Sequence, residues 1–161
     1  MAKIKLFLSW AHDDADLKEE FCKLLKPRLS IAKNHTITWW EDSLILPGDR
    51  WANEIQAQLV ESDYILQLIS PSFLASTFIT NNEIPGVGNT PHKRILPVML
   101  VDVPLNQSTE FHQLDDYQIY YGIDSRPCSF ISCETLYQKI KFVDGFVEQL
   151  LTRISGMTGY H

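Results

Sequence analysis

Short apolar runs of strand length alternate along this chain with longer stretches in which apolar side chains recur at helical spacing. The apolar runs predict strands over residues 4–9, 36–40, 64–69, 94–101 and 118–121. The periodic stretches predict helices over residues 15–25, 50–62, 73–82 and 134–154. Because strands that alternate with helices form βαβ units, the pattern predicts an α/β fold with a parallel sheet of about five strands and helices on both faces.

The run over residues 64–69 (Tyr-Ile-Leu-Gln-Leu-Ile) is apolar at every position except Gln67. Such a run is typical of a strand that is covered on both faces, as in parallel sheets. The first run is also short and apolar, and we expect it to be central in the sheet. Pro97 interrupts the fourth run, and because proline has no backbone N–H we expect it at a bulge or an unpaired position.

The second strand ends in Trp39 and Trp40, and we expect one of these side chains in the core and the other near the loop that follows. Pro47 and Gly48 turn the chain in this loop, and the Asp49 carboxylate is suited to cap the next helix. A long loop at the carboxyl end of a strand is where an open α/β sheet places its binding crevice. This loop is therefore the first candidate for a functional segment.

Two other helix starts carry candidate caps. Asp13 or Asp14 precedes the first helix, and Ser72 precedes the short helix after the third strand. Each of these side chains has an oxygen that can accept a hydrogen bond from a backbone N–H of the first turn. Pro27 is expected to end the first helix or to lie in its last turn.

A chain of 161 residues is long enough to bury a core of its own and is most simply one domain. We assign residues 1–154 to this domain. Residues 155–161 contain glycine and show no hydrophobic pattern, so we expect a C-terminal tail or the start of a linker to a further domain.

The composition narrows the class of protein. Hydrophobic residues make up 45% of the chain and charged residues 21%, which is typical of a globular domain. The net charge of −6 argues against direct nucleic-acid binding, which depends on clustered Lys and Arg. No segment approaches the roughly 20 apolar residues that span a bilayer, and the first apolar run is too short for a signal peptide. We therefore expect a cytoplasmic protein without membrane contacts.

The three cysteines predict reduced thiols, because their number is odd and their spacing forms no framework. Cys22 lies on the apolar face of the first helix and is expected in the core. Cys128 and Cys133 have four residues between them and no second pair of Cys or His at the spacing of a zinc site. The sequence therefore predicts no metal.

Known nucleotide-binding and hydrolase motifs are absent from the sequence. It contains no G-x-G-x-x-G and no G-x-x-x-x-G-K-[ST], and acidic residues of a phosphoacceptor pocket are missing directly after the first strand. No G-x-S-x-G elbow surrounds the serines at positions 70, 72 and 76. The scattered histidines are interpreted as surface residues. Taken alone, Glu83, which follows the third strand, is also more simply a solvated surface carboxylate than a catalytic group.

Three stretches in order carry a family resemblance. Residues 5–11 (Lys-Leu-Phe-Leu-Ser-Trp-Ala) form a strand that ends in Ser beside an aromatic, residues 42–55 contain the Pro-Gly loop, and residues 62–76 cover the third strand and the start of its helix. In this order, and on this alternation of strands and helices, they resemble the sequence boxes and the BB loop of a TIR (Toll/interleukin-1 receptor) domain of the bacterial kind. The resemblance covers residues 4–154.

The resemblance implies a flavodoxin-like three-layer sandwich and, as in many bacterial and plant members, cleavage of the N-glycosidic bond of NAD⁺. The Glu that this family requires lies after the third strand, in the position of Glu83. The usual spacing is an aromatic, three residues and then Glu. Here Phe78 lies five residues before Glu83 and Ile79 holds the usual aromatic slot, a local difference of one residue.

The resemblance further implies that NAD⁺ is the substrate, with no separate cofactor. The side chains expected to bind it are Ser9, Trp10, Trp40, Asp42, Leu44 and Phe78. The loop residues expected to contact a neighbouring copy in a homo-oligomer or filament are Ile45, Leu46, Pro47, Gly48, Arg50 and Trp51.

Two hypotheses follow, and they are compatible. The first is an NAD⁺-consuming effector, activated by self-assembly and serving in bacterial anti-phage defence with a fused or associated sensor domain. The second is a non-catalytic TIR–TIR interaction module that uses the loop over residues 42–51. A nucleotide-binding flavodoxin-like protein outside this family is a weaker third hypothesis, because no phosphate loop is evident.

Overall fold

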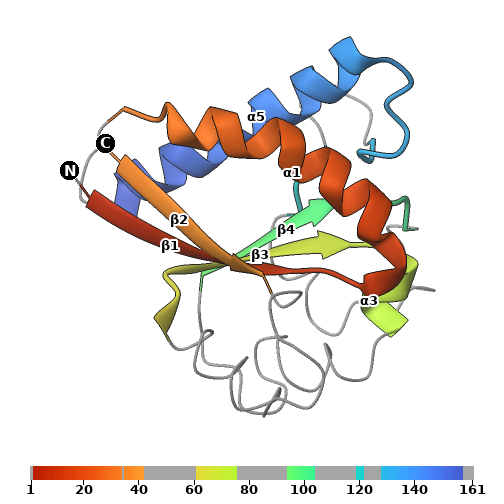
Figure 1. Ribbon diagram of the computed structural model, residues 1–161, viewed down its shortest axis with the longest axis horizontal. Coiled ribbons are helices and arrows are strands. Elements are labelled where there is room, and N and C mark those ends of the chain that lie inside the picture. The colour runs from red at the N-terminus through yellow and green to blue at the C-terminus, as the bar shows by residue number, and fades with distance from the viewer. Residues whose placement is uncertain are drawn as a thin grey trace.

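The computed structural model describes residues 2–33, 35–41, 61–75, 94–103, 119–121 and 128–157. The strands are β1 (Ala2–Ser9), β2 (His35–Glu41), β3 (Tyr64–Ile69) and β4 (Arg94–Met99). The helices are the 3₁₀ turn η1 (His12–Asp14), α1 (Ala15–Ser30), α3 (Pro71–Ala75) and α5 (Leu136–Met157). The predicted order of strands and helices is confirmed wherever the chain is described (Figure 1).

The four strands form one sheet in the order β2-β1-β3-β4, and every pairing is parallel. Phe7 of β1 lies opposite Trp40 of β2 and Ile65 of β3, and Leu66 of β3 lies opposite Leu96 of β4. The first strand is therefore central, as its apolar run predicts. Every side chain of β3 is buried, including Gln67, which agrees with a strand covered on both faces.

Of the fifth predicted strand, the structure describes residues 119–121, which form one parallel bridge, between Val98 and Tyr120. The Tyr120 N–H donates to the Pro97 carbonyl, and the Tyr120 carbonyl accepts from the Met99 N–H, both at 2.8 Å. Pro97 is thus not at a bulge but within the paired part of β4, opposite Gln67. Its missing N–H is tolerated because the bridge to Tyr120 uses its carbonyl oxygen.

Helices α1 and α5 lie side by side over one face of the sheet (Figure 1). Their buried stripes recur every three to four residues, as in amphipathic helices. These side chains are Phe21, Leu25 and Leu29 of α1 and Val143, Phe146, Leu150 and Ile154 of α5. Two ion pairs join the helices: Arg28 Nε lies 2.5 Å from Asp144 Oδ1, and Lys139 is paired with Glu20.

The opposite face of the sheet is covered as well. Its side chains Phe7, Ile65, Ile69, Ile95 and Met99 are all at most 2% exposed. Burial on both faces is the condition for a layered α/β domain, in which each layer hides the apolar side of the next. The predicted α/β fold with a parallel sheet is therefore confirmed.

Some helix boundaries differ from the prediction. Helix α1 ends at Ser30 and not at residue 25, with Pro27 in its last turn as one of the two alternatives predicted. Helix α5 continues to Met157, so the first residues of the predicted tail are helical. The helix predicted over residues 50–62 and most of that over residues 73–82 lie outside the described residues. In the described part of the chain no helix is long and apolar enough to cross a membrane.

Candidate functional site

The carboxyl-terminal edge of the sheet brings together segments that are far apart in sequence. Strands β1 and β3 are parallel neighbours with Ser9 opposite Gln67, so the residues that follow them emerge side by side. Directly after β1 come Trp10 and the turn η1, and directly after β3 come Ser70 and α3. This edge is where open α/β sheets bind ligands.

A hydrogen bond ties the two segments together. Ser70 Oγ donates to Asp14 Oδ2 at 2.5 Å and accepts from the Phe73 backbone N–H at 3.0 Å. Ser70 is fully buried and Pro71 is the first residue of α3, so Ser70 has the geometry of an N-cap. The cap of α3 is therefore Ser70 and not Ser72, because Ser70 is the residue whose oxygen faces the first turn.

The expected capping role of Asp14 is also wrong. Asp14 stands at the N-cap position of α1, but its side chain makes no cap hydrogen bond and instead accepts from Ser70. Burial raises the pKa of the Asp14 carboxyl above its ordinary value, the hydrogen bond from Ser70 lowers it, and the charge of Asp13 raises it further. Burial dominates, so the net direction is upward.

Trp10 is packed under Lys18 at this edge. Trp10 is 5% exposed and Lys18 is 2% exposed, and the Lys18 ammonium lies 4.7 Å from the centroid of the indole ring. Lys18 Nζ also pairs with Glu19 Oε1 at 2.7 Å, and the His12 ring lies 5.1 Å from the Trp10 ring. A cation over an indole face is a favourable contact that strengthens when water is excluded.

The burial of Lys18 was not predicted from the sequence. Charged side chains of helices usually face solvent, and a fully buried lysine is rare. One signal was present: Lys18 precedes the buried Cys22 by four residues and therefore shares its helix face. The indole Nε1 of Trp10 is also buried, and it has no hydrogen-bond partner within the part of the chain that the structure describes.

Few of the predicted site residues fall in the described part of the chain. Ser9 and Trp10 lie at the edge, both buried, and Trp40 pairs with Phe7 through its backbone in β2. Trp39 packs against the core, and Lys26 Nζ lies 5.1 Å from its ring. The others lie outside the described residues: Asp42, Leu44, Ile45, Leu46, Pro47, Gly48, Asp49, Arg50, Trp51, Phe78, Ile79 and Glu83.

The described ranges contain no group of three His, Cys, Asp or Glu side chains able to hold a metal ion. They do contain two adjacent strand ends, a partly buried serine–carboxylate hydrogen bond, and an indole covered by an ammonium group, which together we call the frame at this edge. In the sequence, the predicted substrate-binding and catalytic residues outside the described ranges follow β2 and α3.

A family model for the TIR domain matches residues 6–125, about three quarters of the chain. The chain belongs to the TIR domain family. No curated protein and no solved structure gives a significant match. The matched range begins in β1 and ends shortly after Tyr121, so it includes the carboxyl-terminal edge and stops before α5.

This TIR domain has a groove at the side of the sheet beyond β4, with a volume of about 520 Å³. Its lining residues are Leu96, Pro97, Tyr120, Gly145, Phe146, Glu148, Gln149, Leu150, Thr152 and Arg153. Arg153 Nη1 donates to the Ile95 carbonyl at 3.1 Å and holds α5 against the start of β4. We call this surface the α5 groove.

Gly145 lies in the interior of α5 and is buried at the groove. A glycine in a helix interior costs about 1 kcal/mol relative to alanine, so its lack of a side chain needs a local reason. Here that lack leaves the groove open. The groove was not predicted from the sequence, although Gly145 lies within the predicted helix over residues 134–154.

Proposed function

We propose that this TIR domain cleaves the bond between nicotinamide and ribose in NAD⁺, with Glu83 as the catalytic carboxylate. The observation that supports the proposal is the membership of the TIR family, together with Glu83, which follows β3 where the resemblance places the catalytic glutamate of the family. The frame at the carboxyl-terminal edge supports it. Ser70 anchors the start of the segment that leads to Glu83, and it does so beside the residues that follow β1.

Cleavage of NAD⁺ requires a negative charge close to the ribose and needs little acid catalysis. Nicotinamide leaves as a neutral group from a cationic ring, so the transition state resembles an oxocarbenium ion, as in glycoside hydrolysis. The Glu83 carboxylate stabilises this charge and orients the ribose hydroxyls. Attack of water on the anomeric carbon gives ADP-ribose, and attack of an adenine nitrogen gives a cyclised isomer.

We propose that Ser9, Trp10, Trp40, Asp42, Leu44 and Phe78 line the substrate pocket around Glu83. An aromatic face would stack on the nicotinamide or adenine ring. At Trp10, the ammonium of Lys18 and the ring of His12 already contact the indole. Stacking of a base on Trp10 therefore requires one of these two side chains to move aside.

The test is the release of nicotinamide from NAD⁺ over a series of protein concentrations. Glu83→Gln keeps the size of the side chain and removes its charge, so we expect a rate at least about 100-fold lower. Glu61→Gln is the matched control: Glu61 lies just before β3, at the other end of the strand, and pairs with Lys5 at 3.1 Å. Equal rates for Glu83→Gln and the unsubstituted chain would exclude the proposal.

We further propose that activity depends on self-assembly, triggered by a fused or associated sensor, and that the cell uses it in anti-phage defence. In such an assembly the loop over residues 42–51 of one copy completes the pocket of the next. This arrangement makes NAD⁺ consumption conditional on a trigger. It predicts that the specific activity rises with protein concentration and does not stay constant.

The second candidate function is a non-catalytic TIR–TIR interaction module, and the α5 groove favours it. TIR domains mediate contacts with one another, and the groove offers a concave surface lined by apolar and polar side chains for the loop of a neighbouring copy. Leu46→Asp should then abolish assembly, because it places a charge in a buried contact. In a purely structural module, Glu83→Gln would leave the biological readout unchanged.

Light scattering measures assembly directly. Gln149→Trp fills the α5 groove from its exposed wall, whereas Lys141→Trp places the same side chain on an exposed part of α5 outside the groove. We expect loss of assembly for the first variant and retention for the second. Equal assembly of both variants would show that the groove is not the docking surface.

A further inference from the structure

Strand β2 forms an edge of the sheet. Among the strands that the structure describes, β2 pairs with β1 alone (Figure 1). Every second backbone N–H and C=O of an edge strand points away from its single neighbour, and these groups form a template for another strand. The side chains of Thr36 and Thr38 are exposed, whereas Ile37 and Trp39 pack against the core. The strand therefore turns one face to the core and the other to solvent.

The sequence of β2 lacks the features that usually protect an edge strand. Protected edges carry a lysine, a proline or a bulge, each of which hinders pairing with another chain. Residues 36–40 are Thr-Ile-Thr-Trp-Trp, with no charge, no proline and no glycine, and all five are of types enriched in strands. The register with β1 runs without a break from His35 to Glu41. This edge is therefore regular, uncharged and suited to pairing.

The sequence of β2 is also complementary to itself in the antiparallel direction. A two-fold axis at Thr38 places this residue opposite its counterpart in a second copy, and it places Ile37 opposite Trp39. The same axis places His35, which can carry a positive charge, opposite Glu41 at both ends of the pair. Two threonines, a β-branched residue with an aromatic one, and opposite charges are the pairs that stabilise neighbouring strands.

We propose that β2 pairs with β2 of a second copy of this chain, antiparallel and centred on Thr38. The sheet then continues from β4-β3-β1-β2 in one copy into β2-β1-β3-β4 in its partner. Such a contact uses the same surface on both copies and closes after two of them. It does not depend on NAD⁺ cleavage, because the backbone of β2 makes it. It also leaves the α5 groove open, because β4 is at the opposite side of the sheet.

The position of the axis gives this dimer a geometry that can be measured. Residues directly opposite each other in antiparallel strands have Cα atoms about 4.5–5.5 Å apart. A disulfide spans Cα distances of about 4.4–6.8 Å, so the two copies of position 38 are within its reach. Thr36 lies two residues from the axis, so its two copies are four residues apart, about 13 Å along the strands. Only the first position can therefore be bridged to itself.

Oxidative cross-linking of Thr38→Cys tests this geometry. Thr36→Cys is the matched control, because it lies on the same exposed face of the same strand. We expect the covalent dimer of Thr38→Cys, mapped by mass spectrometry to position 38, to form at least about tenfold faster than that of the control. The unsubstituted chain has three cysteines and measures the background that they contribute. Equal rates for the two variants, or a dimer joined through the native cysteines alone, would contradict the proposal.

Thr38→Lys tests the contact without a covalent bond. It places two ammonium groups opposite each other on the axis, where like charges destabilise the pairing of strands. We expect sedimentation velocity to show monomers at concentrations at which the unsubstituted chain forms dimers. Circular dichroism should show an unchanged fold, because Thr38 is exposed. A dimer that persists in this variant, or an unsubstituted chain that stays monomeric at every concentration, would overturn the proposal.

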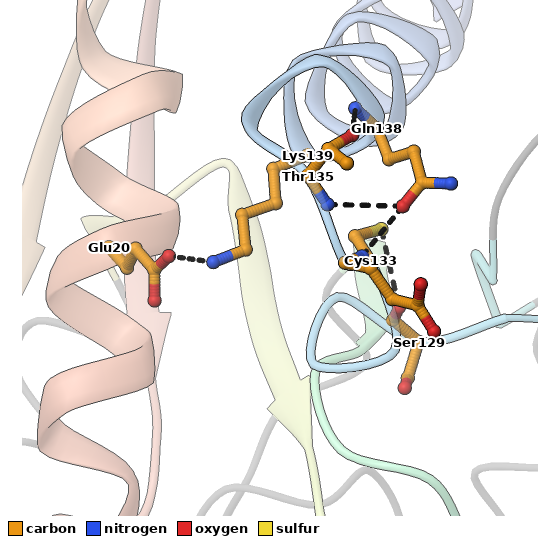
Figure 2. A network of polar contacts seen from close by, with 7 residues as sticks. Glu20, Ser129, Cys133, Thr135, Gln138 and Lys139 are labelled. Carbon is orange, nitrogen blue, oxygen red and sulfur yellow. Dashed lines mark hydrogen bonds and ion pairs between the residues drawn. The ribbon is translucent and has the colours of Figure 1, made fainter.

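Leu136→Lys is the matched control and tests the start of α5 as an alternative surface. Leu136 is 65% exposed, so the substitution adds the same charge at an exposed site. The backbone there is already bonded within one copy, because the N–H groups of Glu134 and Thr135 donate to Gln138 Oε1 at 2.6 and 3.2 Å (Figure 2). We therefore expect Leu136→Lys to keep the dimer. Loss of the dimer in this variant but not in Thr38→Lys would assign the contact to α5 and refute pairing through β2.

Discussion

Ser70 is the residue on which the carboxyl-terminal edge depends most directly. Its hydroxyl donates to the Asp14 carboxylate and accepts from the Phe73 N–H, so one buried side chain fixes the end of β3, the start of α3 and the turn after β1. Removing it leaves a partly buried carboxylate and a buried N–H without these partners.

We expect Ser70→Ala to lower the free energy of unfolding by about 1–3 kcal/mol. Ser72→Ala is the matched control: Ser72 is only partly buried and is not the cap, so its loss should cost about 0.5 kcal/mol or less. Urea titrations of both variants provide the measurement. Equal destabilisation by the two substitutions would contradict the assignment of Ser70 as the cap.

The Asp14 carboxyl gives a pH-dependent prediction. Its pKa is raised in the folded chain, mainly by burial, so the folded state holds the proton more tightly than the unfolded state. The stability that the protonated form contributes is complete below the ordinary pKa of 3.8 and is lost as the pH rises through the folded-state value. Above that value, the buried charge destabilises the fold.

Asp14→Asn removes this charge and keeps an oxygen that accepts from Ser70. We therefore expect the variant to gain stability relative to the unsubstituted chain as the pH rises from 3 to 7. Parallel denaturation curves at the two pH values measure the difference. A relative stability that falls over this range would show that the hydrogen bond from Ser70 outweighs burial.

At the scale of elements, the turn before α5 is docked by an aromatic cluster. The Phe130 ring meets the Phe21 ring edge to face at 5.3 Å and lies 5.9 Å from the Phe142 ring. It thereby joins α1, α5 and the turn over residues 128–133. Such contacts add to the burial of a large apolar surface.

We expect Phe130→Ala to lower the free energy of unfolding by about 3–5 kcal/mol, because it leaves a cavity at the meeting point of these elements. Tyr137→Ala is the control, since Tyr137 is 66% exposed and should cost under about 1 kcal/mol. Thermal or chemical denaturation compares the two variants. A similar loss of unfolding free energy in both variants would mean that the aromatic cluster does not hold the turn.

Element boundaries were less predictable than element types. The strands and the two long helices were visible as apolar runs and periodic stripes, since these patterns are local. Helix α1 continues past Pro27 to Ser30 although proline lacks the N–H of an i→i−4 hydrogen bond, and α5 continues past the expected end at residue 154. The bridge between Tyr120 and Val98 depends on the neighbouring strand and has no local signature in the sequence.

At the scale of the whole molecule, the frame at the carboxyl-terminal edge and the α5 groove lie at different edges of the sheet. Catalysis is proposed at the carboxyl ends of β1 and β3, whereas the groove lies beside β4 and α5. A loop that completes the pocket of a neighbouring copy therefore does not fill the α5 groove of that copy, and the two candidate functions use different docking contacts. Such heterologous contacts build open filaments if the rotation between copies does not close a ring.

A pocket that is completed by the loop of a neighbouring copy predicts complementation between two inactive variants. Glu83→Gln retains an intact loop, and Leu46→Asp retains an intact catalytic carboxylate. In a mixture, the loop of the first variant should complete the pocket of the second, so nicotinamide release should recover to a measurable fraction of the normal rate. A mixture as inactive as each variant alone would contradict a pocket shared between copies.

The sequence by itself determined the alternation of strands and helices, the parallel sheet, the central position of β1 and the TIR family, because each depends on local periodicity or on motifs in order. Only the tertiary structure decided the contacts between segments far apart in the chain. Ser70 and Asp14 are 56 residues apart, and no local pattern reveals that one donates to the other. The burial of Lys18 over Trp10 and the α5 groove likewise form only when the helices pack on the sheet. Tertiary packing, and not local propensity, decides which groups a side chain contacts.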